Sequence, residues 1–300
     1  MKEKELINKI ILNISKVVIG KEGEIKNLLK AIIANGHVLI EDVPGVGKTT
    51  LVKALAKSLD LTFGRIQFTP DVLPSDVTGV SIYNQRDMNF EFKKGPVFSN
   101  ILLGDEINRT SPKTQSSLLE VMEEYQVTEG NITHKLERPF FVLATQNPIE
   151  YHGTYELPEA QLDRFMIKIN IGYPSIEDEV NILEIYKDKS PIDHINKVLS
   201  KEDLMKIQEL CRKVNVHKTI EEYIVSIANE TRNNEYLSVG ISTRASLSLL
   251  KIAQATALME GRNYVIPDDV KNNVKLVLDH RMILSSLAKS GKYSKEKILK

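Results

Sequence analysis

The sequence predicts a parallel α/β domain followed by an all-helical domain. Five apolar runs typical of buried strands alternate with helical patterns up to Gly172, and only helical patterns continue after it. A glycine-rich turn of the kind that binds phosphate lies between the first of these strands and the next helix. We therefore expect an α/β domain over residues 1–172 and a helical domain over residues 173–300.

The α/β domain is expected to contain a five-stranded parallel sheet. Its strands are short apolar runs bounded by polar or turn residues. The runs are His37–Ile40, Phe63–Thr69, Asn100–Glu106, Phe140–Thr145 and Met166–Ile171. Helices are predicted where apolar residues recur every three or four positions. These are Leu6–Val18, Glu24–Ala34, Leu51–Leu59 and Ser111–Glu124.

Two further segments are predicted to be β-hairpins that protrude from the α/β core. In the first, Val80–Tyr83 and Asn89–Phe92 flank a polar tip. In the second, Gln126–Thr128 and Thr133–Leu136 flank a turn at Gly130.

The part of the chain after Gly172 is predicted to form helices alone. They are Ile176–Lys187, Lys201–Val214, Ile220–Asn233, Thr243–Glu260 and Pro267–Asp279. The final residues carry several lysines, which we interpret as a solvated end of the chain.

Composition limits the classes of function that the chain can have. Its 300 residues include 40 basic and 40 acidic side chains, so the net charge gives no reason to expect nucleic acid or an anionic membrane as a partner. Cys211 is the single cysteine, which excludes an intrachain disulfide and fits a reducing cytoplasm. Charges interrupt the N-terminus at once, so we expect no signal peptide. No apolar run approaches the ~20 residues that span a bilayer, so no membrane insertion is expected.

The stretch Glu41–Thr50 is the expected phosphate-binding loop. Its glycines let backbone N–H groups surround a phosphate, and the following helix N-terminus adds positive potential. The Lys48 side chain can reach the β- and γ-phosphates of a nucleotide, and the Thr49 hydroxyl can bind Mg²⁺. The residues expected to contact the nucleotide are Pro44, Gly45, Val46, Gly47, Lys48, Thr49 and Thr50.

One position departs from the usual phosphate-loop pattern. Asp42 stands where a glycine is common, and a carboxylate beside a triphosphate is unfavourable unless it points away. The alternative is a chance Gly-Lys-Thr turn, which the strand before it and the helix after it disfavour.

The other candidates for chemistry stand at the ends of two predicted strands. Asp105 can hold a metal through its waters, and the adjacent Glu106 can polarise an attacking water. An ordinary strand end capped by acids is the alternative, and the presence of Lys48 disfavours it. Asn147 follows another strand and can orient water near the γ-phosphate, although Asn147-Pro148 is equally a common start of a turn.

Arginine is suited to stabilise the charge that develops during phosphoryl transfer, because its guanidinium donates to several oxygens at once. The candidates are Arg109, Arg164 and Arg244. Position in the sequence does not choose between them, and a surface ion pair is the default for any arginine.

Several motifs together resemble those of the AAA+ ATPases, and their residues are similar to those of the MoxR family. They occur in the same order as in the family, from about Val18 to Arg281. The matching stretches are Arg65–Asp71, Gly104–Arg109, Pro112–Gln115, Ala144–Pro148 and Leu157–Phe165. The fold that this resemblance implies is an AAA+ P-loop NTPase core, with the two hairpins as inserts, followed by a small helical lid.

The resemblance also implies a role for each candidate residue. Lys48 and Thr49 would belong to the Walker A motif, and Asp105 and Glu106 to the Walker B motif. Asn147 would be sensor 1. The cofactors would be ATP and Mg²⁺, with Thr49 and Asp105 toward the metal.

Four more assignments come from the resemblance. Arg164 would be the arginine finger, which reaches the nucleotide of the neighbouring subunit. Arg244 would be sensor 2, which responds to the γ-phosphate from the helical lid. Ile19 and Gly20 would lie against the adenine. A finger of this kind requires an oligomer, and the family points to a hexameric ring.

The function that the resemblance implies is ATP-driven remodelling, maturation or activation of partner protein complexes. A partner with a von Willebrand factor A domain is common in the family, and the client complex is not named by the sequence. Two alternatives remain, a chelatase-type ATPase subunit and a motor that acts on nucleic acid. The balanced charge and the mixed charges at the tip of the first hairpin argue against the motor. A nucleotide-gated scaffold without catalysis is disfavoured by Glu106.

Overall fold

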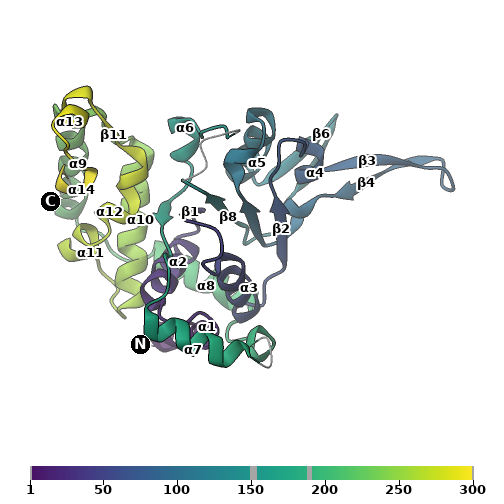
Figure 1. Cartoon of the computed structure of the whole chain (residues 1–300), viewed down its shortest axis with the longest axis horizontal. Helices are drawn as coiled ribbons and strands as arrows, with labels where there is room; N and C mark the ends of the chain where they lie inside the picture. Colours follow the sequence, from purple (N-terminus) through teal and green to yellow (C-terminus); the bar gives the residue numbers. More distant parts are fainter. Residues whose placement is uncertain (1, 149–153, 188–190, 299–300) are drawn as a thin grey trace.

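A computed structural model describes residues 2–148, 154–187 and 191–298 of the chain (Figure 1). A parallel sheet lies at the centre, with helices on both of its faces and a group of helices at one side. Its strand order is β2-β5-β8-β1-β9, which confirms the predicted five-stranded parallel sheet. The strands are β1 (Val38–Glu41), β2 (Phe63–Gln67), β5 (Ile101–Asp105), β8 (Phe141–Gln146) and β9 (Ile167–Ile169).

The central strands are apolar along their length because both faces of the sheet are covered. Side chains alternate between the two faces, so Ile101 and Leu103 of β5 enter one core while Leu102 enters the other. Helices that contribute to the first core are α1 (Lys2–Ser15), α2 (Glu22–Ile33) and α3 (Lys48–Ser58). The second core includes α5 (Pro112–Glu124) and α4 (Pro74–Thr78).

Both predicted hairpins are formed, and the first extends far from the sheet (Figure 1). It pairs β3 (Gly79–Asn84) with β4 (Asn89–Lys94), and the second pairs β6 (Gln126–Glu129) with β7 (Ile132–Lys135). The second hairpin, next to its turn, contacts the first hairpin near the base of the latter. The Glu129 carboxylate accepts hydrogen bonds from the Ser81 N–H at 2.8 Å and the Ser81 hydroxyl at 2.6 Å.

The region after Gly172 is mainly helical, as predicted. Its helices are α7 (Ile176–Tyr186), α8 (Lys201–Arg212), α9 (Lys218–Arg232), α10 (Thr243–Met259), α11 (Pro267–Lys271), α12 (Val274–Leu278), α13 (Ser286–Ser290) and α14 (Lys295–Ile298). The region also contains the short helical segments η3 (Pro191–His194) and η4 (Asp279–Arg281), and the part before it contains α6 (Glu159–Leu162), η1 (Pro96–Phe98) and η2 (Ile107–Arg109).

Three details of this region differ from the sequence-based expectation. The predicted helix Pro267–Asp279 is divided into α11 and α12 by Asn273, a buried residue whose side-chain amide donates to the Asp269 carbonyl at 2.7 Å. An antiparallel strand pair, β10 (Leu237–Val239) with β11 (Ile283–Leu284), lies among the helices. The last residues are more than a solvated end, because the Lys295 ammonium donates to the Asp279 carbonyl at 2.8 Å.

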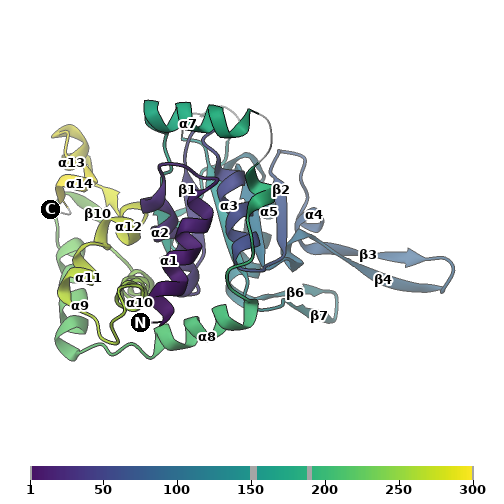
Figure 2. The same ribbon diagram turned by 90° about the horizontal axis from the view of Figure 1, so that it is seen from below.

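The apolar core is continuous between the sheet and most of the later helices. Residues of α8 and α10, such as Ile207 and Leu249, belong to the same core cluster as Leu28 of α2. Helix α7 differs, because none of its residues is buried and it lies on the outside of the molecule (Figure 2). Within the described residues, no helix combines the length and apolar character that crossing a bilayer would require.

Candidate active site

The carboxyl end of the sheet, where the parallel strands end, gathers the residues predicted to contact a nucleotide. Strand β1 ends at Glu41, directly before the glycine-rich loop. Strand β8 ends directly before Asn147, and strand β5 ends at Asp105. Because β8 lies between β1 and β5, these ends are neighbours at the usual strand separation of about 4.8 Å. The loop, Asp105, Glu106 and Asn147 therefore lie at one end of the sheet.

The loop has the backbone conformation that binding a phosphate requires. Gly45 and Gly47 adopt φ of +84° and +83°, a region that disfavours other residues. Helix α3 begins at Lys48, three residues earlier than predicted, so the N–H groups of its first turn lack intrahelical partners. Such a helix start favours anions. The Lys48 ammonium donates to the Asp42 carbonyl at 3.1 Å and so remains folded over the loop.

The structure explains how Asp42 is tolerated in this loop. Its side chain is buried, and Oδ2 accepts hydrogen bonds from the N–H groups of Ile171 at 2.6 Å and Gly172 at 2.7 Å. The other oxygen, Oδ1, accepts from the Val43 N–H at 2.9 Å. The carboxylate thus points away from the inside of the loop, which is the condition for tolerating it there, and joins the loop to the segment after β9.

The two acidic residues at the end of β5 have different hydrogen-bond partners. Asp105 is buried, and its Oδ2 accepts from Arg65 Nε at 2.7 Å while its Oδ1 accepts from the Thr145 hydroxyl at 3.3 Å. Glu106 has φ of +57°, an uncommon conformation for a residue other than glycine, and its N–H donates to the same Thr145 hydroxyl at 2.9 Å. Arg65, which contacts Asp105, also donates to Gln67 Oε1 at 3.2 Å.

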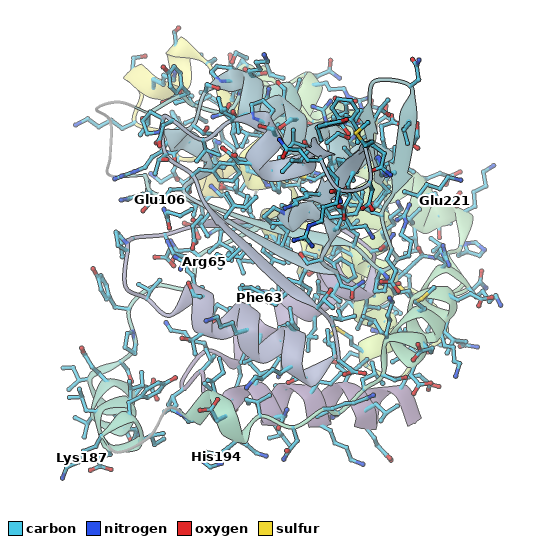
Figure 3. The ribbon with its side chains drawn as sticks, turned by 90° about the vertical axis from the view of Figure 1, so that its right-hand side faces the viewer. Phe63, Arg65, Glu106, Lys187, His194 and Glu221 are labelled. Atoms are coloured by element: carbon cyan, nitrogen blue, oxygen red, sulfur yellow. The ribbon has the colours of Figure 1, made fainter. Side chains whose placement is uncertain are left out.

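Side chains from two other segments hold the Glu106 carboxylate. Its Oε2 accepts from Gln67 Nε2 at 2.8 Å and lies 3.1 Å from Arg109 Nε. Figure 3 shows Glu106 and Arg65 toward the same end of β2, beyond Phe63 at its beginning. Gln67 and Thr145 were not predicted as site residues, although each is a polar residue at the carboxyl end of a strand, and that position was the available signal.

The donor atoms at this end of the sheet fit Mg²⁺. The Asp105 carboxylate and the Thr49 hydroxyl would supply oxygen ligands, which Mg²⁺ prefers. Among the residues that the structure describes, no group of three or more His, Cys, Asp or Glu side chains could hold a metal ion. In nucleotide sites, phosphates and waters supply most of the ligands of Mg²⁺.

An apolar cavity of about 330 Å³ lies beside the loop. Ile19, which was expected to lie against the adenine, is among its lining residues. The others include Val17, Val18, Val46, Thr50, Tyr173, Ile182 and Tyr186. Gly20 has φ of +70° and lies against the start of α7, since an added Cβ would come within 2.1 Å of the Asp178 carboxylate. Cavities of this kind accept flat apolar groups such as a nucleobase.

Helix α7 forms a wall of this cavity that sequence reasoning did not anticipate. The Tyr186 hydroxyl donates to the Val17 carbonyl at 3.4 Å, and burial raises the pKa of Tyr186. Little in the sequence indicated that α7 would line this cavity. The helix follows the expected domain boundary, and its apolar residues are consistent with packing in a helical domain.

Arg164 and Arg244 lie at the opposite, amino end of the sheet, where the strands begin. Glu123, near the end of α5, contacts both: its Oε2 accepts from Arg164 Nε at 3.0 Å, and its Oε1 accepts from Arg244 Nη2 at 2.5 Å. These three residues line a cavity of about 300 Å³, and His37, which precedes β1, lines it too. The strand from His37 to Asp42 spans roughly 16 Å at the usual rise per residue. Neither arginine is therefore brought to the phosphate loop of its own chain.

The segment that carries Arg164 is held by a buried arginine from the end of the chain. Arg281 Nε donates to Asp163 Oδ1 at 2.8 Å, and its two Nη atoms donate to the carbonyls of Phe165 at 2.7 Å and Met166 at 3.1 Å. Burial lowers the pKa of Arg281 to about 10, and the Asp163 carboxylate opposes that shift. Sequence reasoning missed Arg281 and Glu123, because nothing in the local sequence indicates their distant partners.

A buried histidine completes this end of the sheet. His37 Nδ1 accepts from the Val142 N–H at 3.0 Å, so Nε2 carries the proton and donates to the Met122 carbonyl at 3.0 Å. Burial lowers the pKa of His37 to about 4, so the ring is neutral near pH 7.

The chain matches known proteins over nearly all of its length. Residues 37–167 match a family described as the ATPase family associated with various cellular activities (AAA), and residues 229–300 match the AAA lid domain. The chain is 52% identical over 284 residues to the uncharacterized protein YeaC of Bacillus subtilis, covering 95% of this chain and 89% of that protein. It is 42% identical over 306 residues to Chaperone MoxR1 of Mycobacterium tuberculosis, covering 99% of this chain and 81% of that protein.

A crystal structure from Cytophaga hutchinsonii, of a protein regarded as an ATPase candidate, is also similar. The two structures superpose with a TM-score of 0.93 at 44% sequence identity, covering 99% of this chain and 93% of that one. The similarity therefore extends through both the sheet and the helices that follow it.

Proposed function

The chain belongs to the MoxR family of AAA+ ATPases, and we propose on that basis that it hydrolyses ATP, with Mg²⁺, at a site shared by two copies. One observation carries the proposal. The phosphate loop and the Glu106 carboxylate lie at the carboxyl end of the sheet, whereas Arg164 and Arg244 lie at its amino end. A complete site then needs the carboxyl end of one copy and the amino end of another.

The carboxyl end would bind the nucleotide. The N–H groups around Gly47 and the Lys48 ammonium would hold the β- and γ-phosphates, and the apolar cavity lined by Ile19 and Tyr186 would take the adenine. The Thr49 hydroxyl and the Asp105 carboxylate would hold Mg²⁺. When bound, the metal supplies positive charge to the β- and γ-phosphates.

Glu106 and Asn147 would act on the attacking water. The Glu106 carboxylate is suited to accept a proton from it, and Gln67 and Arg109 fix the direction of that carboxylate through its Oε2. The buried amide of Asn147, directly after β8, would orient the water toward the γ-phosphate. Arg109 is engaged with Glu106, which makes it a weaker candidate than Arg164 for contact with the phosphates.

The two arginines of the neighbouring copy would stabilise the charge that spreads over the γ-phosphate during transfer. Arg164 would act as the arginine finger, and Arg244 would respond to the γ-phosphate from the lid. Both would act across the boundary between copies, because both lie near Glu123 at the amino end. The assembly proposed is a hexameric ring, as in other AAA+ proteins.

The biological role proposed is chaperone-like remodelling or activation of a partner complex. The name of Chaperone MoxR1, 42% identical to this chain, supports it. A partner with a von Willebrand factor A domain and a cytoplasmic location are part of the same proposal. The buried Cys211 thiol, whose pKa burial raises to about 12, is unreactive and consistent with a reducing compartment.

A subunit-mixing experiment tests the shared site. Arg164→Ala should bind ATP normally and lose roughly 10³-fold in turnover, the usual worth of an arginine finger. Lys48→Ala should also be inactive, because it lacks a phosphate contact in its own loop. Mixing the two variants should restore turnover at boundaries that combine the loop of the first with the arginines of the second.

Equal amounts of each variant alone, assayed at the same total concentration, provide the control. A mixture no more active than its components would contradict a site shared by two copies, whereas full activity of Arg164→Ala alone would remove that residue from the site.

A further inference from the structure

Glu123 connects the two arginines of the amino end. One oxygen of its carboxylate accepts from Arg164 and the other from Arg244, so the two guanidinium groups share a single carboxylate. The two arginines come from segments 80 positions apart in the sequence, and Glu123 lies on a third segment, α5. The Ser242 hydroxyl, which donates to Asp163 at 2.9 Å, holds the two segments together, whereas Glu123 joins the two guanidinium groups themselves.

The charges around this carboxylate make it necessary to that arrangement. The cavity beside it is lined by three cationic side chains, Arg164, Arg244 and Lys251, and by two carboxylates, Glu123 and Asp163. Without Glu123, the cations would face one another with one carboxylate between them, and like charges at this range repel.

The second carboxylate is already engaged elsewhere. Asp163 accepts from buried Arg281 at 2.8 Å and from the Ser242 hydroxyl at 2.9 Å, and its distance to Arg244 Nη1 is 4.0 Å. It therefore cannot replace Glu123 as the group that holds Arg164 and Arg244 together.

We propose that Glu123 is a positioning residue for hydrolysis at the neighbouring copy: it holds Arg164 and Arg244 at the separation at which one phosphate group can bind both. A phosphate, like a carboxylate, presents anionic oxygens close together on one atom, and arginine binds both groups in the same way. The incoming γ-phosphate then takes the place of the carboxylate with little movement of either arginine. This inference rests on the proposed function, since it concerns the same shared site.

Replacing Glu123 should lower turnover more than nucleotide binding. In Glu123→Gln the arginines separate and must be brought together in each cycle, so kcat should fall about tenfold, as for other losses of orientation. The KM for ATP should stay nearly constant, because the loop of the binding copy is unchanged. Glu123→Asp keeps the charge and should recover part of the lost kcat. The side chain is 41% exposed, so the thermal midpoint should not change.

A double-mutant cycle tests whether Glu123 acts through the arginines. Steady-state ATPase assays would compare Glu123→Gln, Arg244→Ala and the double variant, with Glu124→Gln as a control for the same charge change on the same helix. In the described residues, Glu124 has no hydrogen bond or ion pair to an arginine. We expect Glu123→Gln to have little further effect once Arg244 is removed.

The outcomes separate this inference from the proposed function. If Arg164→Ala and Arg244→Ala lower turnover while Glu123→Gln behaves like Glu124→Gln, the positioning role is wrong and the shared site stands. A full, additive loss from Glu123→Gln in the Arg244→Ala background would also overturn it. If neither arginine variant affects turnover, the shared site itself is wrong.

Discussion

The two ends of the sheet are built in different ways, and the difference indicates how the site works. At the carboxyl end, Lys48, Asp105 and Asn147 follow strands that are neighbours in the sheet. Their positions are therefore fixed by the fold of one domain. The amino end joins α5, the segment before β9 and the start of α10, so its arginines depend on contacts between distant segments.

This contrast separates binding from activation. In the proposed function, the backbone donors, the lysine and the carboxylates of the carboxyl end hold the nucleotide and its metal. The amino end has cationic side chains gathered around Glu123 and Asp163 but no phosphate loop. Variants at the carboxyl end should thus affect a copy's own nucleotide, and variants at the amino end should affect a neighbour's.

The largest effect that would sharpen this comparison is expected from Glu106→Gln. Loss of the base should lower kcat by roughly 10³-fold, within the range for general base catalysis. The affinity for ATP should be retained, because Lys48, Thr49 and Asp105 are unchanged. Single-turnover hydrolysis and equilibrium binding of a fluorescent ATP analogue would measure the two quantities separately.

The position of the base makes this variant different from the arginine variants. In mixing experiments, Glu106→Gln should not be rescued by Lys48→Ala, because both changes affect the copy that binds the nucleotide and every boundary then lacks either the base or the lysine. Mixing with Arg164→Ala should restore turnover where Arg164→Ala binds the nucleotide and Glu106→Gln supplies Arg164. Turnover in the mixture with Lys48→Ala would contradict the division between the two ends.

A smaller effect is expected from lowering the pH, which should reduce the stability of the fold through the buried His37 at the amino end. The pKa of His37 is lowered by burial from 6.5 to about 4, so the unfolded chain binds a proton that the folded chain does not between these values. The contribution of neutral His37 to the free energy of unfolding is fully present above pH 6.5. It is lost as the pH falls toward 4, by up to about 1.4 kcal/mol per pH unit. The buried His280 has its pKa lowered by burial too and contributes in the same direction.

Urea denaturation at several pH values between 7 and 4.5 would measure this dependence. The variant His37→Gln retains a donor for the Met122 carbonyl and an acceptor for the Val142 N–H, but it cannot be protonated. Its stability should fall less steeply with decreasing pH than that of the parent chain. Equal slopes for the two proteins would show that His37 does not titrate as proposed.

The smallest effect is expected from Asp42→Asn at the carboxyl end. The asparagine loses one charged acceptor for the N–H groups after β9, so the free energy of unfolding should fall by about 1.5 kcal/mol. Denaturation at pH 7 would measure it. Asp60→Asn is a matched control, because its partner Lys197 and its own side chain are more than half exposed and such pairs contribute little. An equal loss in both variants would contradict the role given to Asp42.

The carboxyl end could be predicted from the sequence because contiguous residues encode it. The loop before Lys48, the apolar strand before Asp105 and the strand before Asn147 each combine a local pattern with a local chemistry. Neighbouring parallel strands then bring these short segments together. The sequence left the effect of Asp42 open, since its carboxylate is unfavourable unless it points away, and the hydrogen bonds from Ile171 and Gly172 show that it does.

The amino end could not be predicted in this way. Arg164 and Arg244 were candidates, but Glu123 lies among other acidic residues on α5, and nothing nearby distinguishes it. Its partners are fixed only when the helices pack. The division between α11 and α12 was missed for a similar reason, since Asn273 is fixed by hydrogen bonds within the packed helices.

The location of the two half-sites at opposite ends of one sheet limits how copies can associate. A two-fold pair brings identical surfaces together, whereas this site joins unlike surfaces, so copies must add head to tail. An open row then always ends with one phosphate loop that has no arginines and, at its other end, one pair of arginines that has no loop. Only closure makes every copy equivalent, and the direction of the row gives the closed assembly two distinguishable faces.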